Sequence, residues 1–192
     1  MNETIKVFRK GNKIIVRISG RFRRALSFWQ PWASAIVDGP KAIDNRPRRP
    51  PLDMIGKVFY IHAAKKWDQG MYVDVLRIWS NHLPRGSIDQ YAPTQALMIS
   101  CFNERPSVFQ EQMHKLFPFG ALIGTARLVG VVDPKKNPDT THLTSRARSI
   151  FNKAREEWFF GTQYGLILDE REPLPEPIPC RGHQGPWWVP IE

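Results

Sequence analysis

Four polar residues that are close in the sequence, Lys41, Asp44, Asn45 and Arg46, have side chains of the types that suit recognition of a nucleotide. The lysine ammonium is a point charge and the arginine guanidinium is a planar fork, and both bind phosphate oxygens. The carboxylate and the amide suit hydrogen bonds with the edge of a base. We therefore expect a nucleotide site here. The alternative is structural, with Lys41 or Arg46 pairing with Asp44 only to fix the loop.

Other residues could extend this site. His62 is followed by Lys65 and Lys66, which favours a further anion contact or a general acid–base role for the imidazole. A purely structural histidine is the alternative. Trp29 and Gln30 precede the polar cluster, and an indole can stack on a base. We expect Trp29, Gln30, His62 and Lys65 to contribute to binding, with core packing as the alternative for the tryptophan.

Positive charge is concentrated at the start of the chain. The net charge is +10, and residues 1–50 hold 12 basic and 3 acidic residues. Such a field attracts polyanions and releases their counterions. The sequence therefore predicts RNA or DNA, or a nucleotide-like small molecule, as the partner; a solvated basic extension is the alternative. The residues expected to contact the phosphate backbone are Lys6, Arg9, Lys10, Lys13, Arg21, Arg23 and Arg24.

Short elements must position these residues. Residues 5–18 read as two β segments around a Gly-Asn turn, which predicts a basic hairpin. Residues 25–28 form an apolar strand, and a proline at the first turn begins a helix over residues 32–37. Residues 41–46 are then expected on a tight loop. The apolar run 57–63 predicts a central strand.

The rest of the chain predicts an α+β fold. Residues 68–118 have apolar side chains near helical spacing, and residues 121–132 return to β character. A helix is expected over residues 144–158 and a strand over 164–168, and the proline-rich stretch 173–190 must be extended. Strands and short helices alternate without βαβ regularity. This predicts a small, partly open mixed β-barrel with short helices packed around it.

Composition argues against several protein classes. Hydrophobic residues make up 42% of the chain, enough for a core and too many for wholesale disorder. No run approaches the roughly 18 apolar residues of a membrane span, and the first residues do not resemble a signal peptide, so we expect a cytoplasmic protein. Cys101 and Cys180 are expected as free thiols. Cys180 and His183 supply at most half of a metal site, so no metal or cofactor is expected.

Five blocks of the sequence resemble the ASCH domain, the activating-signal-cointegrator homology family. They occur in the family's order, and the resemblance extends over about residues 25–190. The blocks are residues 25–33 (ALSFWQPWA), 39–46 (GPKAIDNR), 61–68 (IHAAKKWD), 119–126 (FGALIGTA) and 175–187 (PEPIPCRGHQGPW).

The resemblance implies a fold like that of the pseudouridine-synthase and archaeosine-transglycosylase (PUA) domain, with a cleft beside the short helix that is suited to RNA, DNA or a nucleoside. It also implies a division of the chain. Residues 1–24 would be a basic hairpin extension, and residues 25–192 the ASCH domain with a helical enlargement at about 68–118.

The family includes amidohydrolases that act on N4-acetylcytidine as well as ribonucleases. The amidohydrolase pattern pairs a lysine with a threonine three residues later, and here Asp44 follows Lys41 at that spacing. A carboxylate cannot replace the nucleophilic hydroxyl. We therefore expect an RNA- or nucleotide-binding domain. The first alternative is a hydrolase, a ribonuclease above all, with Lys41, Asp44 and His62 as catalytic groups and a divalent metal as an option. A protein-interaction module is the second alternative.

Overall fold

The structure is a computed structural model, and it describes residues 4–10, 13–19, 24–68, 111, 114, 117–135 and 137–189. The segment predicted to be a helical enlargement falls mostly outside these residues, as does Cys101. The elements are β1 (Thr4–Lys10), β2 (Lys13–Ser19), β3 (Arg24–Gln30), α1 (Trp32–Val37), β4 (Ile43–Arg46), a 3₁₀ turn (Leu52–Met54), β5 (Val58–Trp67), β6 (Ala121–Val132), α5 (Ser145–Trp158), β7 (Tyr164–Pro179) and β8 (Trp187–Trp188).

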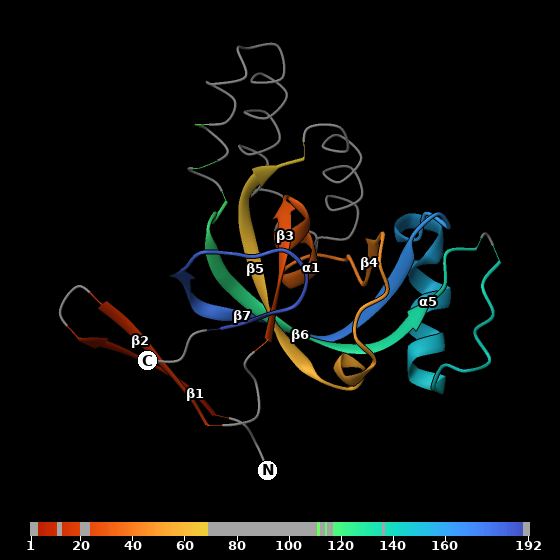
Figure 1. The fold of residues 1–192 in the computed structure, drawn as a ribbon, viewed down its shortest axis with the longest axis horizontal. Helices are drawn as coiled ribbons and strands as arrows, with labels where there is room; N and C mark the ends of the chain where they lie inside the picture. Colours follow the sequence, from red (N-terminus) through yellow and green to blue (C-terminus); the bar gives the residue numbers. More distant parts are fainter. Residues whose placement is uncertain are drawn as a thin grey trace, which may run out of the picture.

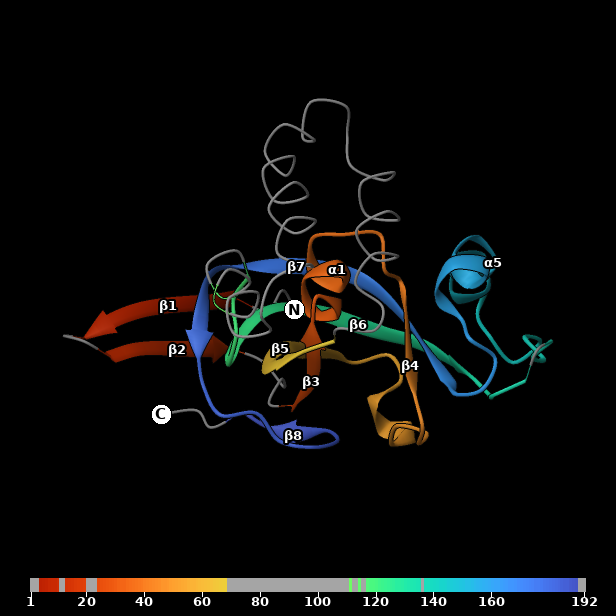
Figure 2. The same ribbon diagram turned by 90° about the horizontal axis from the view of Figure 1, so that it is seen from above.

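Six strands form one mixed sheet in the order β4-β7-β6-β5-β3-β8. Strands β3 and β5 are parallel, and every other neighbouring pair is antiparallel. Figures 1 and 2 show the curved sheet with α1 and α5 packed against it. The α+β class predicted from the sequence is confirmed. Among the described strands the sheet is open, because β4 and β8 are edge strands that do not pair with each other. Closure into a barrel stays a prediction.

Helix α1 is an integral part of the main core. All its residues from Ala33 to Val37 are buried, and they pack with apolar side chains of β3, β5, β6 and β7. Gly124 of β6 permits this close approach, because a Cβ there would lie 2.7 Å from a Val37 methyl carbon. The short helix is therefore held firmly against the sheet.

Helix α5 covers the end of the sheet that carries β4. Thr144 caps it by accepting a hydrogen bond from the Ala147 amide at 3.2 Å. Its buried residues Ala147, Phe151, Ala154 and Trp158 recur at three- and four-residue spacing and so form one apolar face. That face packs on Ile43 and Ile167 of the sheet, so the last turn of α5 lies beside β4.

Several elements agree with the sequence prediction and two differ. The helix at residues 32–37, the strand at 121–132 and the helix that ends at Trp158 are confirmed. The expected loop over residues 41–46 is wrong in part, because Ile43–Arg46 forms β4 by pairing with the start of β7. Strand β7 also continues to Pro179, well beyond residue 168. Its prolines are tolerated because, beyond β4, β7 is hydrogen-bonded to β6 alone.

Strands β1 and β2 form a separate two-stranded antiparallel sheet. Lys6 lies opposite Arg17 in the register, and Lys10 lies opposite Lys13. The predicted hairpin is therefore present, and Figure 1 shows it outside the six-stranded sheet. Its separation at residue 24 as an independent extension stays a prediction. None of the described helices has the length and apolar character needed to cross a membrane.

Candidate nucleic-acid site

A pocket of about 450 Å³ lies between β3 and β4, two strands that are not neighbours in the sheet. Its volume is within the range of about 300–1,000 Å³ that is usual for small-molecule sites. We call it the Lys41 pocket. It is lined by Ser27, Phe28, Trp29, Trp32, Lys41, Asp44, Asn45, Arg46, Pro47, Asp68, Phe160 and Gln163. The pocket therefore occupies the gap at which the sheet stays open.

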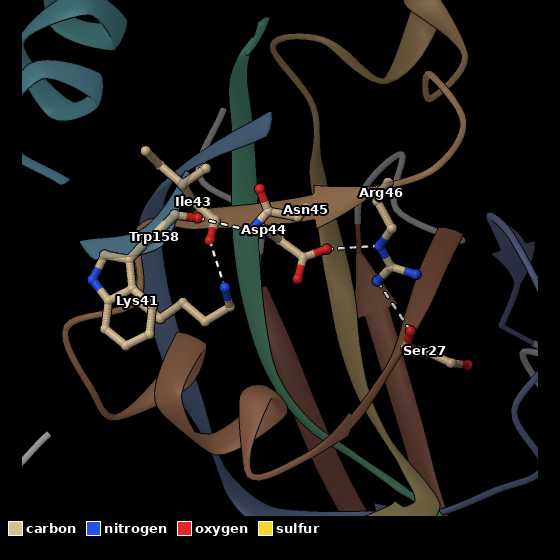
Figure 3. Close-up of polar contacts among 7 residues, drawn as sticks. All are labelled: Ser27, Lys41, Ile43, Asp44, Asn45, Arg46 and Trp158. Atoms are coloured by element: carbon tan, nitrogen blue, oxygen red, sulfur yellow. Dashed lines mark hydrogen bonds and ion pairs between the residues drawn. The ribbon is translucent and has the colours of Figure 1, made fainter. Parts of the chain in front are cut away.

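Lys41 forms the buried floor of this pocket and is only 2% exposed. Its ammonium donates a hydrogen bond to the Ile43 carbonyl oxygen at 2.7 Å (Figure 3). It also lies 4.8 Å from the ring centre of Trp32 and 5.0 Å from that of Trp158, so two indole faces stabilise the charge. Lys41 is therefore a buried cation rather than an exposed one, because α5 covers it with Trp158.

Burial changes the acid–base behaviour of this lysine. The pKa of Lys41 falls from 10.5 to about 8, mainly because burial disfavours the charged ammonium; the charge of Asp44 partly opposes this fall, and that of Arg46 adds to it. Just above physiological pH, Lys41 therefore carries a neutral amine in a fraction of the molecules.

Arg171 of β7 fixes the backbone that carries Lys41, and the sequence analysis missed it. Its guanidinium donates hydrogen bonds to the carbonyl oxygens of Ile36 at 3.2 Å, Gly39 at 3.0 Å and Lys41 at 3.0 Å. Ile36 is in the last turn of α1, where carbonyl oxygens lack helical partners, and Gly39 and Lys41 lie just after the helix. No local pattern marks Arg171, because the groups it binds lie far away in the sequence.

Asp44 and Arg46 form an ion pair on β4, with Arg46 Nε 2.6 Å from Asp44 Oδ2 (Figure 3). The guanidinium also donates to the Ser27 carbonyl oxygen at 3.0 Å and lies 4.5 Å from the ring centre of Phe28. Arg46 therefore bridges β4 to β3 across the open gap. These bonds use two of its five N–H groups, and in the described part of the chain the other three are unoccupied.

Asn45 and Gln30 have structural partners. The Asn45 amide donates to the Trp158 carbonyl oxygen at 2.7 Å and accepts from the Phe160 amide at 3.2 Å, which ties β4 to the end of α5. The Gln30 side chain is fully buried and bonds to Ser34 of α1 through both its oxygen and its nitrogen. Gln30 lines neither pocket described in this section, and its side chain holds α1; its predicted contact with a ligand stays a prediction.

A second pocket, of about 940 Å³, lies on the other side of Trp29. We call it the His62 pocket. It is lined by Ser27, Trp29, His62, Ala64, Lys65, Phe119, Gly120, Pro179, Cys180, Arg181, Gly182, His183 and Gln184. The structure therefore separates His62 and Lys65 from Lys41, Asp44 and Arg46, which the sequence analysis had grouped in a single cleft. Trp29 and Ser27 line both pockets.

His62 is 2% exposed and joins β5 to the C-terminal segment. Its Nδ1 lies 3.1 Å from the Ser27 hydroxyl, and its Nε2 lies 3.3 Å from the Cys180 carbonyl oxygen. The same hydroxyl is 3.0 Å from the His183 carbonyl oxygen and accepts from the Trp187 indole at 3.2 Å. Burial lowers the pKa of His62, opposed by its contact with Cys180. The geometry favours the structural alternative for this imidazole.

The described part of the basic patch is divided between two sheets. Lys6, Arg9, Lys10 and Lys13 lie on β1 and β2. Arg24, in contrast, begins β3, pairs with Asp53 at 2.8 Å and lies 5.1 Å from the Trp188 ring centre. Arg24 therefore also contributes to the main sheet, and its assignment to the phosphate patch stays a prediction. Arg21 and Arg23 lie outside the described residues.

Metal-ligating side chains are not grouped in the described ranges, where no three His, Cys, Asp or Glu residues come together. Cys180 is a half-buried free thiol, and burial raises its pKa.

A comparison with known proteins finds solved structures that are similar to this one. The solved structures that match include ASCH proteins, the family that the five sequence blocks resemble. An ASCH protein from Zymomonas mobilis matches at 16% identity and a TM-score of 0.40, with 87% of each chain covered. Two single-substitution variants of that protein match at 17% and 16% identity, with TM-scores of 0.42 and 0.41; 87% of this chain is covered in both, and 89% and 87% of theirs. No protein-family model matches the sequence, and neither does any curated protein.

Proposed function

We propose that the protein binds RNA or a nucleotide, with one nucleotide seated in the Lys41 pocket. The observation that carries this proposal is the position of Arg46, whose guanidinium faces a pocket of nucleotide size with three N–H groups unoccupied in the described structure. A phosphate or a carboxylate is the partner that such a planar fork fits. The PUA-like cleft implied by the sequence resemblance supports the same ligand class.

The walls of the pocket suit the base of that nucleotide. Trp29 and Phe160 are 45% and 49% exposed at the pocket rim, and exposed aromatic faces stack on bases. Asp44 uses Oδ2 for Arg46, which leaves Oδ1 as an acceptor for an amino group of the base. Cation, aromatic surface and carboxylate are thus combined in one site.

The test is a titration of the protein with each of the four nucleoside 5′-monophosphates, in which calorimetry or tryptophan fluorescence measures the binding. Arg46→Lys keeps the charge and loses the fork, and we expect it to weaken binding about tenfold or more, because a hydrogen bond to a charged group contributes about 1.5–3 kcal/mol. Arg146→Ala is the matched control, since Arg146 also pairs with a carboxylate, that of Asp169, and lines neither pocket. Equal affinities of Arg46→Lys and wild type would contradict the proposal.

One observation favours a second candidate, a hydrolase that uses the same pocket. Lys41, with its pKa lowered to about 8, could take up a proton near neutral pH, and Asp44 lies beside it. The binding assays are therefore repeated as turnover assays on single-stranded RNA, with and without Mg²⁺. If the protein is a hydrolase, Asp44→Asn should lower turnover about 100-fold or more. A protein that only binds releases no product in either buffer.

A further inference from the structure

We propose that the His62 pocket is a second anion site, which takes the phosphate of the nucleotide next to the one in the Lys41 pocket. This inference rests on the proposed function. It assigns Lys65 and Arg181 as the phosphate ligands, and it makes the preferred ligand a chain of at least two nucleotides that passes over Trp29.

The charge of the His62 pocket favours an anion. Lys65 and Arg181 are both exposed side chains on its wall, and no Asp or Glu is among the described residues that line it. Within the described ranges neither cation pairs with a carboxylate, and two such cations create a local positive potential, which phosphate neutralises with release of counterions.

The backbone places Lys65 over this pocket. The Lys65 side chain runs across Gly120, where a Cβ would lie 3.1 Å from its Cε and 3.3 Å from its Cγ. Gly120 also has a positive φ of 62°, a conformation that glycine adopts at no steric cost. The stem of the lysine is therefore packed on backbone, which lowers the entropy lost when its ammonium binds a phosphate.

The segment that carries Arg181 is anchored on both sides. Before Arg181, the Cys180 amide donates to the Gly120 carbonyl oxygen at 2.9 Å. After it, the His183 carbonyl oxygen accepts a hydrogen bond from the Ser27 hydroxyl at 3.0 Å. Gly182 lies directly on the His62 ring, with no room for a side chain. Arg181 is consequently presented from a fixed backbone.

Trp29 joins the two pockets. It lines both of them, is 45% exposed, and has the Lys66 ammonium 3.9 Å from its ring centre. A nucleic-acid backbone that leaves the Lys41 pocket on this side meets Lys66 at the indole and then Lys65 and Arg181. Adjacent phosphates of one chain can therefore be neutralised in order.

The experiment measures affinity as a function of ligand length. Mixed-sequence, fluorescein-labelled RNAs of two, four and six nucleotides are titrated against the full chain by anisotropy, with nucleoside 5′-monophosphates as the one-nucleotide reference. Wild type should bind the tetranucleotide at least about tenfold more tightly than a mononucleotide. The double variant Lys65→Ala/Arg181→Ala should lose most of this gain and lower the slope of log K against log salt by about 0.7, the value for the one phosphate that these two cations share. Its affinity for a mononucleotide should be unchanged.

The control is Lys57→Ala/Lys153→Ala, which removes the same charge from two exposed positions outside both pockets. If the control lowers the tetranucleotide slope as much as the double variant does, the effect is one of net charge and the inference is overturned. If mononucleotide binding depends on Arg46 while length adds nothing, only the second site fails. If Arg46 is irrelevant to every ligand, the proposed function fails first.

Discussion

At the scale of single residues, Lys41 is the group whose environment differs most from an ordinary lysine. It is charged at neutral pH and yet only 2% exposed, and burial lowers its pKa from 10.5 to about 8. The unfolded chain keeps its proton up to about pH 10.5, so it binds more protons than the folded chain between pH 8 and 10.5. The free energy of unfolding should therefore rise with pH over this interval.

Lys41→Met tests this coupling, because methionine keeps an unbranched side chain between the two indoles and cannot titrate. The stability of wild type relative to Lys41→Met should rise from pH 7.5 to 10 by an amount on the order of 3 kcal/mol, at about 1.4 kcal/mol per pKa unit. Urea unfolding at intervals of half a pH unit measures the difference. Parallel stability curves for the two proteins would show that Lys41 titrates normally in the fold.

At the scale of elements, the contact of the C-terminal segment with β3 and β5 depends on Gly182. A Cβ at this position would overlap the His62 ring and lie 2.8 Å from the Ser27 hydroxyl. We expect Gly182→Ala to destabilise the protein by about 1–3 kcal/mol, the usual cost of overpacking. In a His62→Ala background the ring is gone, so the same methyl should cost less. Equal costs in thermal or urea unfolding would show that the two residues are not coupled.

At the scale of the whole molecule, the two pockets are lined by the six-stranded sheet, helix α1 and the segments that connect them, and none of the described lining residues belongs to β1 or β2. Strands β1 and β2 pair only with each other among the described strands. We expect a chain that lacks residues 1–22 to unfold cooperatively and to keep its affinity for mononucleotides. Its affinity for longer RNA should fall and depend less on salt, because fewer phosphates are neutralised. Loss of folded protein, seen by circular dichroism, would assign the hairpin to the core; an unchanged salt slope would remove it from the interface.

The sequence by itself determined the elements whose signals are local. A proline before an apolar stretch predicts α1, the return to valine, isoleucine and threonine over residues 121–132 predicts β6, and the helix expected over residues 144–158 corresponds to α5. It also grouped Lys41, Asp44 and Arg46 as one candidate site, and these residues do line one pocket. Such signals involve residues only a few positions apart, so they can be recognised in the sequence without knowledge of the tertiary structure.

Only the tertiary structure decided how exposed these residues are and which of them lie together. Lys41 is buried because α5, more than a hundred residues later in the chain, brings Trp158 over it. Strand β4 exists because β7 offers it a pairing edge, and His62 belongs to a second pocket because the C-terminal segment folds back over β3. Burial and strand pairing arise from contacts between distant segments, and no spacing within one segment encodes them.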